Sequence, residues 1–201
     1  MAITEFSLSG RNNTKSDSML IGNSSVAPAY DFIAKQNGTG SSGIIEFWNI
    51  PSNYTHLQIR GIGRSDYATG NYVSTSFQFN GAGGTEYSSR YLVGNGASAS
   101  AYDWAPTSQI YGTFNTAVNA IALNYAAYII DIFDYTNTNK YKTIRCLNGF
   151  DNNALGSTSF NQGTVGISSG LWKSTSAITS MKIINSGNWT TDTNFALYGI
   201  G

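Results

Sequence analysis

The chain has 201 residues and a formal net charge of zero, with only 11% charged residues and 22 glycines. Ordinary soluble domains carry about 25% charged residues, so Ser, Thr and Asn must fill most of the surface here. A nucleic-acid partner needs a basic face that neutralises phosphates, and the 11 Lys and Arg residues form no cluster, which excludes nucleic acid. No apolar stretch reaches the roughly 18 residues of a membrane span, and the N-terminus shows no secretory signal pattern.

The first 28 residues are polar and show no sustained hydrophobic period. Isolated apolar residues occur at Phe6, Leu8, Met19 and Leu20. We expect an extended N-terminal arm over residues 1–28, ordered only by a partner, with Phe6 and Leu8 as its assembly contacts. The folded domain is predicted to cover residues 29–201.

From residue 29 onward, short alternating segments are separated by Gly, Asn, Ser and Pro, as is typical of β-strands and turns. The predicted strands cover residues 30–35, 44–50, 55–64, 72–80, 86–93, 109–114, 162–168, 177–185 and 194–200, with a hairpin at 128–150. Residues 97–108 are predicted to be a loop, and 116–124 fit either a loop or a short helix. About ten short strands with regular turns predict an all-β fold, an antiparallel two-sheet sandwich of the jelly-roll-like kind.

The hairpin at 128–150 is the strongest organising signal in the chain. Its first strand is rich in β-branched and aromatic residues, and its turn holds Thr and Asn. Ile130 and Ile132 point to one face, whereas Phe133 and Tyr135 point to the other. Because both faces carry large apolar groups, we expect this strand to be buried on both sides.

Charges and a single cysteine mark the second half of this hairpin. Asp134 lies across the turn from Lys140 and Lys142, so opposite charges are expected to pair there. Cys146 is the only cysteine, which rules out an intrachain disulfide and a cysteine-based metal site. We expect Cys146 to be a small buried residue.

The sequence offers no credible catalytic set. The only histidine, His56, is predicted to share an exposed face with Gln58 and Arg60, with neither an acid nor a nucleophile positioned beside it. Residues 166–170 match the G-x-S-x-G nucleophile pattern, but neither a helix pattern nor a histidine follows them. We therefore expect no enzyme, no cofactor and no metal site.

Tyr102 and Trp104 are the best candidates for a surface contact in the predicted loop. Aromatic rings on a loop can stack on a sugar, which would make this a carbohydrate-binding module or a receptor-binding adhesin with a host surface glycan as ligand. The alternative, which we favour, is that the two rings pack within the fold or against a neighbouring subunit.

Six motifs occur in order along the domain. They are H-L-Q-I-R at 56–60, F-Q-F-N-G at 77–81, Y-S-S-R-Y-L-V-G-N-G at 87–96, D-Y-T-N-T-N-K-Y-K-T at 134–143, S-G-L-W-K-S-T-S-A-I-T-S at 169–180 and N-F-A-L-Y-G-I at 194–200. Together they resemble a group of tailed-bacteriophage virion structural proteins that includes head-decoration and fibre-like proteins. The resemblance covers residues 30–201 and departs from that group's pattern by a short insertion before residue 194.

The resemblance implies a jelly-roll-like sandwich and a role in viral assembly. The chain would then be a capsid decoration protein or a head or tail fibre component, located in the virion and assembled in the host cytoplasm. Its partners would be other virion proteins of the capsid or tail. Self-association into a homo-oligomer is also expected, with a trimer as one option, because an uncovered sheet edge invites pairing.

Overall fold

A computed structural model describes residues 30–153 and 160–201, so Phe6, Leu8 and the expected arm lie outside the described residues. The described chain forms two antiparallel sheets, which confirms the predicted all-β sandwich. It contains twelve strands instead of about ten: β1 (Asp31–Asn37), β2 (Ile44–Phe47), β3 (His56–Gly63), β4 (Tyr72–Phe79), β5 (Tyr87–Gly94), β6 (Ala99–Thr107), β7 (Ile110–Thr116), β8 (Ala126–Phe133), β9 (Lys142–Asp151), β10 (Gly163–Trp172), β11 (Met181–Asn185) and β12 (Asn194–Ile200). A short 3₁₀ turn, Phe160–Gln162, precedes β10.

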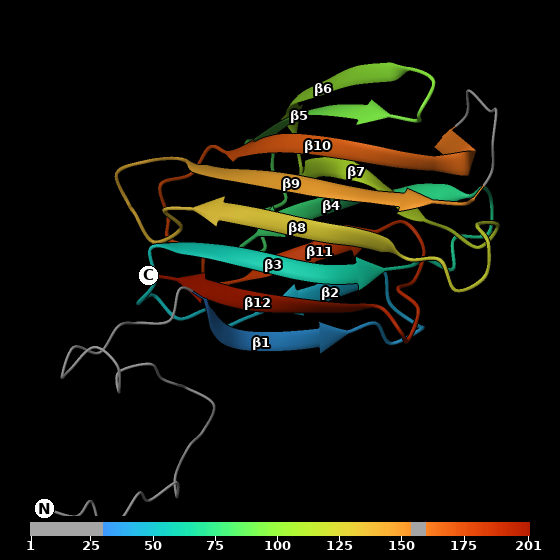
Figure 1. The fold of residues 1–201 in the computed structure, drawn as a ribbon. Coiled ribbons are helices and arrows are strands. Elements are labelled where there is room, and N and C mark those ends of the chain that lie inside the picture. Colours follow the sequence, from blue (N-terminus) through green and yellow to red (C-terminus); the bar gives the residue numbers. More distant parts are fainter. Residues whose placement is uncertain (1–29, 154–159) are drawn as a thin grey trace, which may run out of the picture.

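The strand order identifies a jelly roll widened by two hairpins. The large sheet runs β1-β12-β3-β8-β9-β10-β5-β6 and the small sheet runs β2-β11-β4-β7 (Figure 1). Without β5, β6, β9 and β10, each sheet has four strands in the interleaved order of a jelly roll. The hairpins β5–β6 and β9–β10 add four strands to the β8 side of the large sheet only, so the small sheet faces a partner twice its width.

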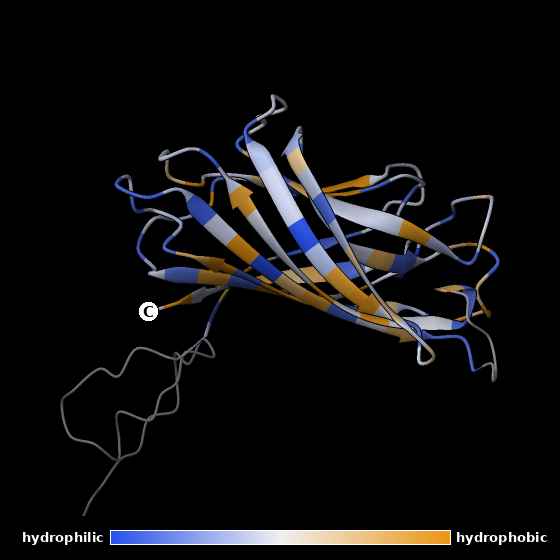
Figure 2. Cartoon of the chain, turned by 90° about the horizontal axis from the view of Figure 1, so that it is seen from above, coloured by the Kyte–Doolittle hydropathy of each residue, from blue (hydrophilic) through white to orange (hydrophobic). Residues whose placement is uncertain are grey.

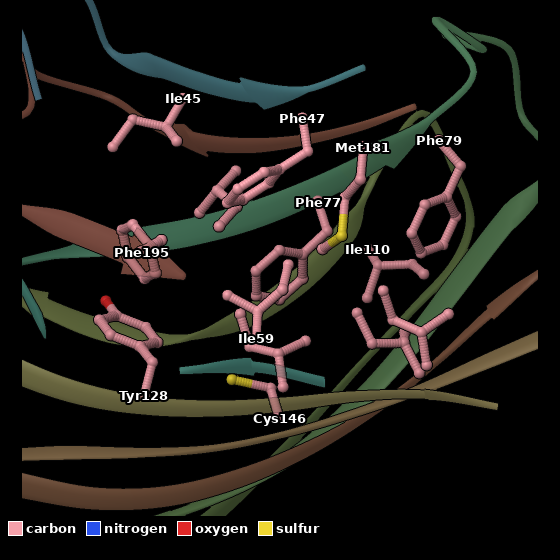
Figure 3. Close-up of a cluster of buried hydrophobic side chains, with 14 of the residues drawn as sticks. Ile45, Phe47, Ile59, Phe77, Phe79, Ile110, Tyr128, Cys146, Met181 and Phe195 are labelled. Carbon is pink, nitrogen blue, oxygen red and sulfur yellow. The ribbon is translucent and has the colours of Figure 1, made fainter. Parts of the chain in front are cut away.

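Alternating side chains fill the space between the sheets, and the colours along the strands switch between hydrophobic and hydrophilic accordingly (Figure 2). Ile59 and Cys146 reach inward from the large sheet, and Phe47, Phe77 and Met181 reach inward from the small one (Figure 3). Full burial of a large apolar side chain stabilises the fold by about 1.5–3 kcal/mol. These contacts between the two layers therefore hold the sandwich together.

The predicted hairpin is present as β8 and β9, with Ile130 opposite Cys146. Burial alternates along β8, so Ile130 and Ile132 are buried while Ile129 and Phe133 are exposed. The expectation that both faces of this strand are buried is therefore wrong, because the small sheet covers only one face of the large sheet. Tyr135 lies beyond the end of β8, where it is buried and its hydroxyl donates to the carbonyl of Pro51.

The predicted loop at 97–108 is also wrong, because these residues form the edge strand β6. Before its last residue, Thr107, its Ala-rich sequence lacks the β-branched residues that mark central strands. Pro106 is tolerated because an edge strand has one unpaired side. Residues 117–125 contain turns and no helix. The Arg64 guanidinium donates to four carbonyls in this segment, those of Val118, Ala120, Ile121 and Asn124.

A buried lysine anchors the β8–β9 turn. The Lys142 side chain is fully buried, and its ammonium donates to the backbone carbonyls of Asn137, Lys140 and Thr175. Burial lowers the pKa of this ammonium. Of the two ion pairs expected for Asp134, the one with Lys140 forms directly, whereas Lys142 binds carbonyl oxygens instead.

The buried thiol of Cys146 gives a first test of the fold. Only 1% of Cys146 is exposed, and burial raises the pKa of its thiol to about 12. Since the thiolate is the reactive form, the native thiol should react slowly. We expect a maleimide or a disulfide reagent at pH 8 to leave the native chain unmodified and to label one thiol after unfolding in guanidinium. Rapid labelling of the native chain would contradict the inward orientation of β9.

Replacement of Lys142 tests the anchored turn. Lys142→Met leaves three carbonyls without their donor, and we expect it to lower the free energy of unfolding in urea by about 2 kcal/mol. Lys140→Met is the matched control on the same turn, because the Lys140 side chain is 58% exposed and exposed ion pairs stabilise little. Equal losses for the two variants would contradict an anchoring role for Lys142.

Candidate functional site

The residues that sequence reasoning tested for chemistry do not converge. The described ranges 30–153 and 160–201 contain no group of three His, Cys, Asp or Glu side chains that could hold a metal ion. His56 is half-buried; its Nδ1 accepts a hydrogen bond of 3.0 Å from the backbone N–H of Asp134, and its ring meets Phe133 edge-on. Lys140 lowers the pKa of Asp134 through its hydrogen bond and its charge. His56 thus joins the start of β3 to the turn after β8.

The G-x-S-x-G segment lies inside strand β10 and not at a strand-to-helix turn. Ser168 is buried and points into the sandwich, with Cys146 and Tyr91 as its neighbours on the flanking strands. This orientation differs from the exposed, sharply turned serine that the motif needs for nucleophilic attack.

Tyr102 and Trp104 belong to an aromatic cluster inside the chain. The Trp104 ring stacks on Tyr91 with 5.1 Å between centroids and a 13° angle, and it also contacts Tyr111 at 5.2 Å. Tyr102 lies 4.9 Å from the Tyr91 ring. Burial raises the pKa of Tyr91 to about 12. These contacts favour packing over sugar stacking, and glycan binding by the two residues stays a prediction.

The most distinctive surface is the outer face of the large sheet, which lies in front of the small sheet in Figure 1. All eight strands are paired, with register shifts only between Phe32 and Ala34 in β1 and between Tyr87 and Ser89 in β5, so outward side chains still form rows that cross the whole sheet. We name three adjacent rows. Each row is given in the strand order β1, β12, β3, β8, β9, β10, β5, β6. The charged row is Phe32, Tyr198, Gln58, Asp131, Arg145, Ser169, Arg90 and Asp103, and the apolar row is Lys35, Ala196, Arg60, Ile129, Leu147, Ile167, Leu92 and Ala101. The small row is Asn37, Asn194, Ile62, Ala127, Gly149, Val165, Gly94 and Ala99.

The centre of the apolar row is a continuous aliphatic strip over four neighbouring strands. Its residues are Ile129, Leu147, Ile167 and Leu92, which are 40%, 46%, 44% and 51% exposed. Ile62 and Val165 of the small row extend the strip toward one end of the sheet. With strands about 4.8 Å apart and rows about 6.8 Å apart, the patch covers on the order of 300 Å². A contiguous apolar patch of this size often marks an interaction surface.

The charged row beside this strip is neutral as a whole. Asp131 accepts hydrogen bonds from Gln58 and Arg145, both at 2.7 Å, and Arg90 forms an ion pair with Asp103 at 3.3 Å. Each acidic side chain therefore already has a basic partner on the same face. A surface that is apolar in one row and charge-balanced in the next suits another protein surface better than an ionic ligand.

A hollow of about 600 Å³ opens above the charged row. Ser169 lies in its lining between two arginines, Arg145 and Arg90, and Leu92 and Ile167 of the apolar row also border it. The small Ser169 side chain leaves room there for a long side chain from outside the chain.

Sequence reasoning missed this surface although its signal was present. The second apolar face of the hairpin strand was visible through Phe133, and the strand was expected to be buried on both sides within the chain, but Ile129 and Leu147 were not singled out. Val165, Ile167 and Leu92 join them only through the pairing of β10 with β9 and β5. The pairing of β10 with β5 brings together residues as distant in sequence as Ile167 and Leu92, which no local pattern reveals.

Neither a membrane-spanning helix in the described part of the chain nor a related protein was found. Among the residues that the structure describes, no helix has the length and apolar character of a membrane span. Searches against protein-family models, curated proteins and solved structures found no match.

Proposed function

We propose that this chain is a non-enzymatic structural protein of a bacteriophage particle, either a capsid decoration protein or a component of a head or tail fibre. The observation that carries the proposal is the outer face of the large sheet, where an aliphatic strip crosses four strands beside a charge-balanced row. The ordered motifs that resemble phage virion proteins support the same assignment.

The fold suits such a role for physical reasons. A protein that assembles into a particle needs a rigid body and a broad contact surface. The large sheet supplies a surface whose backbone is fixed by continuous antiparallel pairing, so few groups lose freedom when a partner binds. The neutral, weakly charged chain also avoids long-range repulsion between many closely spaced copies.

The proposed arm would leave the domain beside this surface. Tyr30 directly precedes β1, and the Arg60 guanidinium lies 4.9 Å from the centre of the Tyr30 ring. Arg60 belongs to the apolar row, so the Tyr30 side chain, just before β1, contacts the outer face. Phe6 and Leu8 of the arm would then contact a neighbouring virion protein.

Quantitative mass spectrometry of purified particles tests the proposal. We expect this chain in the particle at a fixed ratio to the major capsid protein. A ratio near that of the lattice identifies a decoration protein, and a few copies for each particle identify a fibre component. Absence of the chain from purified particles would overturn the assignment.

Deletion of residues 1–20 tests the arm. We expect the truncated chain to keep the circular dichroism and melting temperature of the full chain and to be lost from particles when it is supplied in place of the full chain. Full-length chain carrying Phe6→Ala and Leu8→Ala should show the same loss. Normal incorporation of both variants would contradict an assembly role for residues 1–20.

A further inference from the structure

We propose that the outer face of the large sheet binds a second copy of the same chain, around a two-fold axis parallel to the strands and midway between β9 and β10. This inference rests on the proposed assembly function and names the partner of the face. A two-fold contact uses the same surface on both copies, so the surface must be complementary to itself. The rows of the outer face allow that condition to be examined strand by strand.

The proposed axis fixes which strands face each other. It places β9 over β10 of the second copy, β8 over β5, and β3 over β6. Packed sheets lie about 10 Å apart with strand directions within about 30° of each other. Each row of one copy then faces the same row of the other, because the axis runs along the strands and only reverses the order of strands.

The apolar row meets aliphatic partners throughout its centre. Leu147 faces Ile167 of the second copy, and Ile129 faces Leu92. All four side chains are at least 40% exposed in the single chain, so this contact removes the aliphatic strip from water on both copies. Burial of exposed apolar surface is the main favourable contribution to protein association.

The charged row is complementary at one position under the same axis. Asp131 faces Arg90 of the second copy, so an acidic group meets a basic group, whereas Gln58, which faces Asp103, is only 7% exposed and already donates to Asp131 of its own chain. Arg145 faces Ser169, the small residue in the lining of the hollow of about 600 Å³. The hollow provides space for the Arg145 side chain of the other copy, which is 56% exposed in the single chain. This contact fits by size and not by charge, because Arg90 and Arg145 of the receiving copy flank Ser169.

The small row fits by size. Val165, which is 62% exposed, faces Gly149 of the second copy, where no side chain occupies the space. Ala127 faces Gly94. A projecting residue in one sheet therefore meets a gap in the other, which is the kind of shape match that close packing requires.

Neighbouring arrangements fit less well. An axis along β10 would place Arg145 over Arg90 of the second copy, so like charges would meet. An axis along the apolar row would place the charged row over the small row and bury four charged side chains against Gly and Ala. Charge disfavours these two axes, and the match of Val165 with Gly149 favours the axis between β9 and β10.

The overlapping area is sufficient for a stable dimer. Six strands, β3 to β6 in sheet order, overlap around this axis. At about 4.8 Å for each strand and about 3.4 Å for each of roughly seven residues, they give about 700 Å² from each copy. A standard specific interface uses about 800 Å² from each partner.

Sedimentation velocity of the full chain across micromolar concentrations tests the dimer. We expect a dimer for the wild type and a monomer for Ile167→Asp, with the dissociation constant raised at least about a hundredfold, because a charge then lies at the centre of the contact. Ile44→Asp on β2 of the small sheet is the matched control: Ile44 is 46% exposed, close to the 44% of Ile167. The control should remain a dimer, and circular dichroism should show all three chains folded.

Cross-linking tests the register of the two copies. We expect a short bis-maleimide that spans about 10 Å, the separation of packed sheets, to join Ile129→Cys chains to Leu92→Cys chains when the two are mixed. Either variant alone should give little product, because identical positions lie three strands away from each other across the axis. Buried Cys146 supplies little background in the native chain.

Three results would overturn the inference. They are a wild type that stays monomeric, a trimer, and cross-linking that is as strong within each variant as between the two. These outcomes are independent of the particle test. If the chain is a monomer in solution but abundant in particles, the two-fold contact is wrong and the proposed function stands. If it is a dimer that is absent from particles, the two-fold contact stands and the proposed function is wrong.

Discussion

Antiparallel pairing across the eight strands of the large sheet, with register shifts only in β1 and at the start of β5, is the constraint on which the rest of the structure depends. Successive residues of a strand point to opposite faces, so register decides which side chains share a row on each face. On the inner face it aligns residues such as Ile59, Ile130 and Cys146 beneath the small sheet. On the outer face the same pairing aligns Ile129 with Leu147. A slip of one residue in β9 would expose the core residues and bury the charged ones.

Sequence patterns predicted the local elements and the fold class because both depend on short-range alternation. The β8–β9 hairpin and the buried Cys146 followed from the two apolar runs and the polar turn between them. Strand β6 escaped prediction because an edge strand needs little apolar surface, and its Ala- and Ser-rich sequence is also typical of loops.

The candidate surface escaped prediction for a different reason. Both faces of a strand with two apolar faces need a partner surface, but the alternation of residues does not say whether that surface belongs to the same chain. The apolar outward face that Phe133 marks in the sequence therefore remains exposed in the single chain. The remaining residues of the surface depend on which strands become neighbours. The pairing of β10 with β5 joins distant segments, and the alternation within either strand carries no information on that choice.

Two cationic side chains, those of Arg64 and Lys142, hold segments that form no strand by binding their backbone carbonyls. Arg64 donates hydrogen bonds to four carbonyls of the segment after β7, and Lys142 donates to three carbonyls near the β8–β9 turn. The two segments lie at opposite ends of β8 and close the sandwich there without helices. Each cation replaces the backbone partners that a regular element would provide, which satisfies polar groups that would otherwise be costly to bury.

The two inserted hairpins connect the architecture to the proposed assembly role. In a jelly roll of two four-stranded sheets, each sheet covers the inner face of the other. Here β9, β10, β5 and β6 extend only the large sheet, so part of its inner face needs another cover. The cluster of Tyr91, Trp104 and Tyr111 helps to close that overhang with aromatic rings. The outer face gains four strands and receives no cover from the described chain, and its aliphatic strip lies mainly on these added strands. The same insertions that widen the sheet thus create the surface that a second copy can cover.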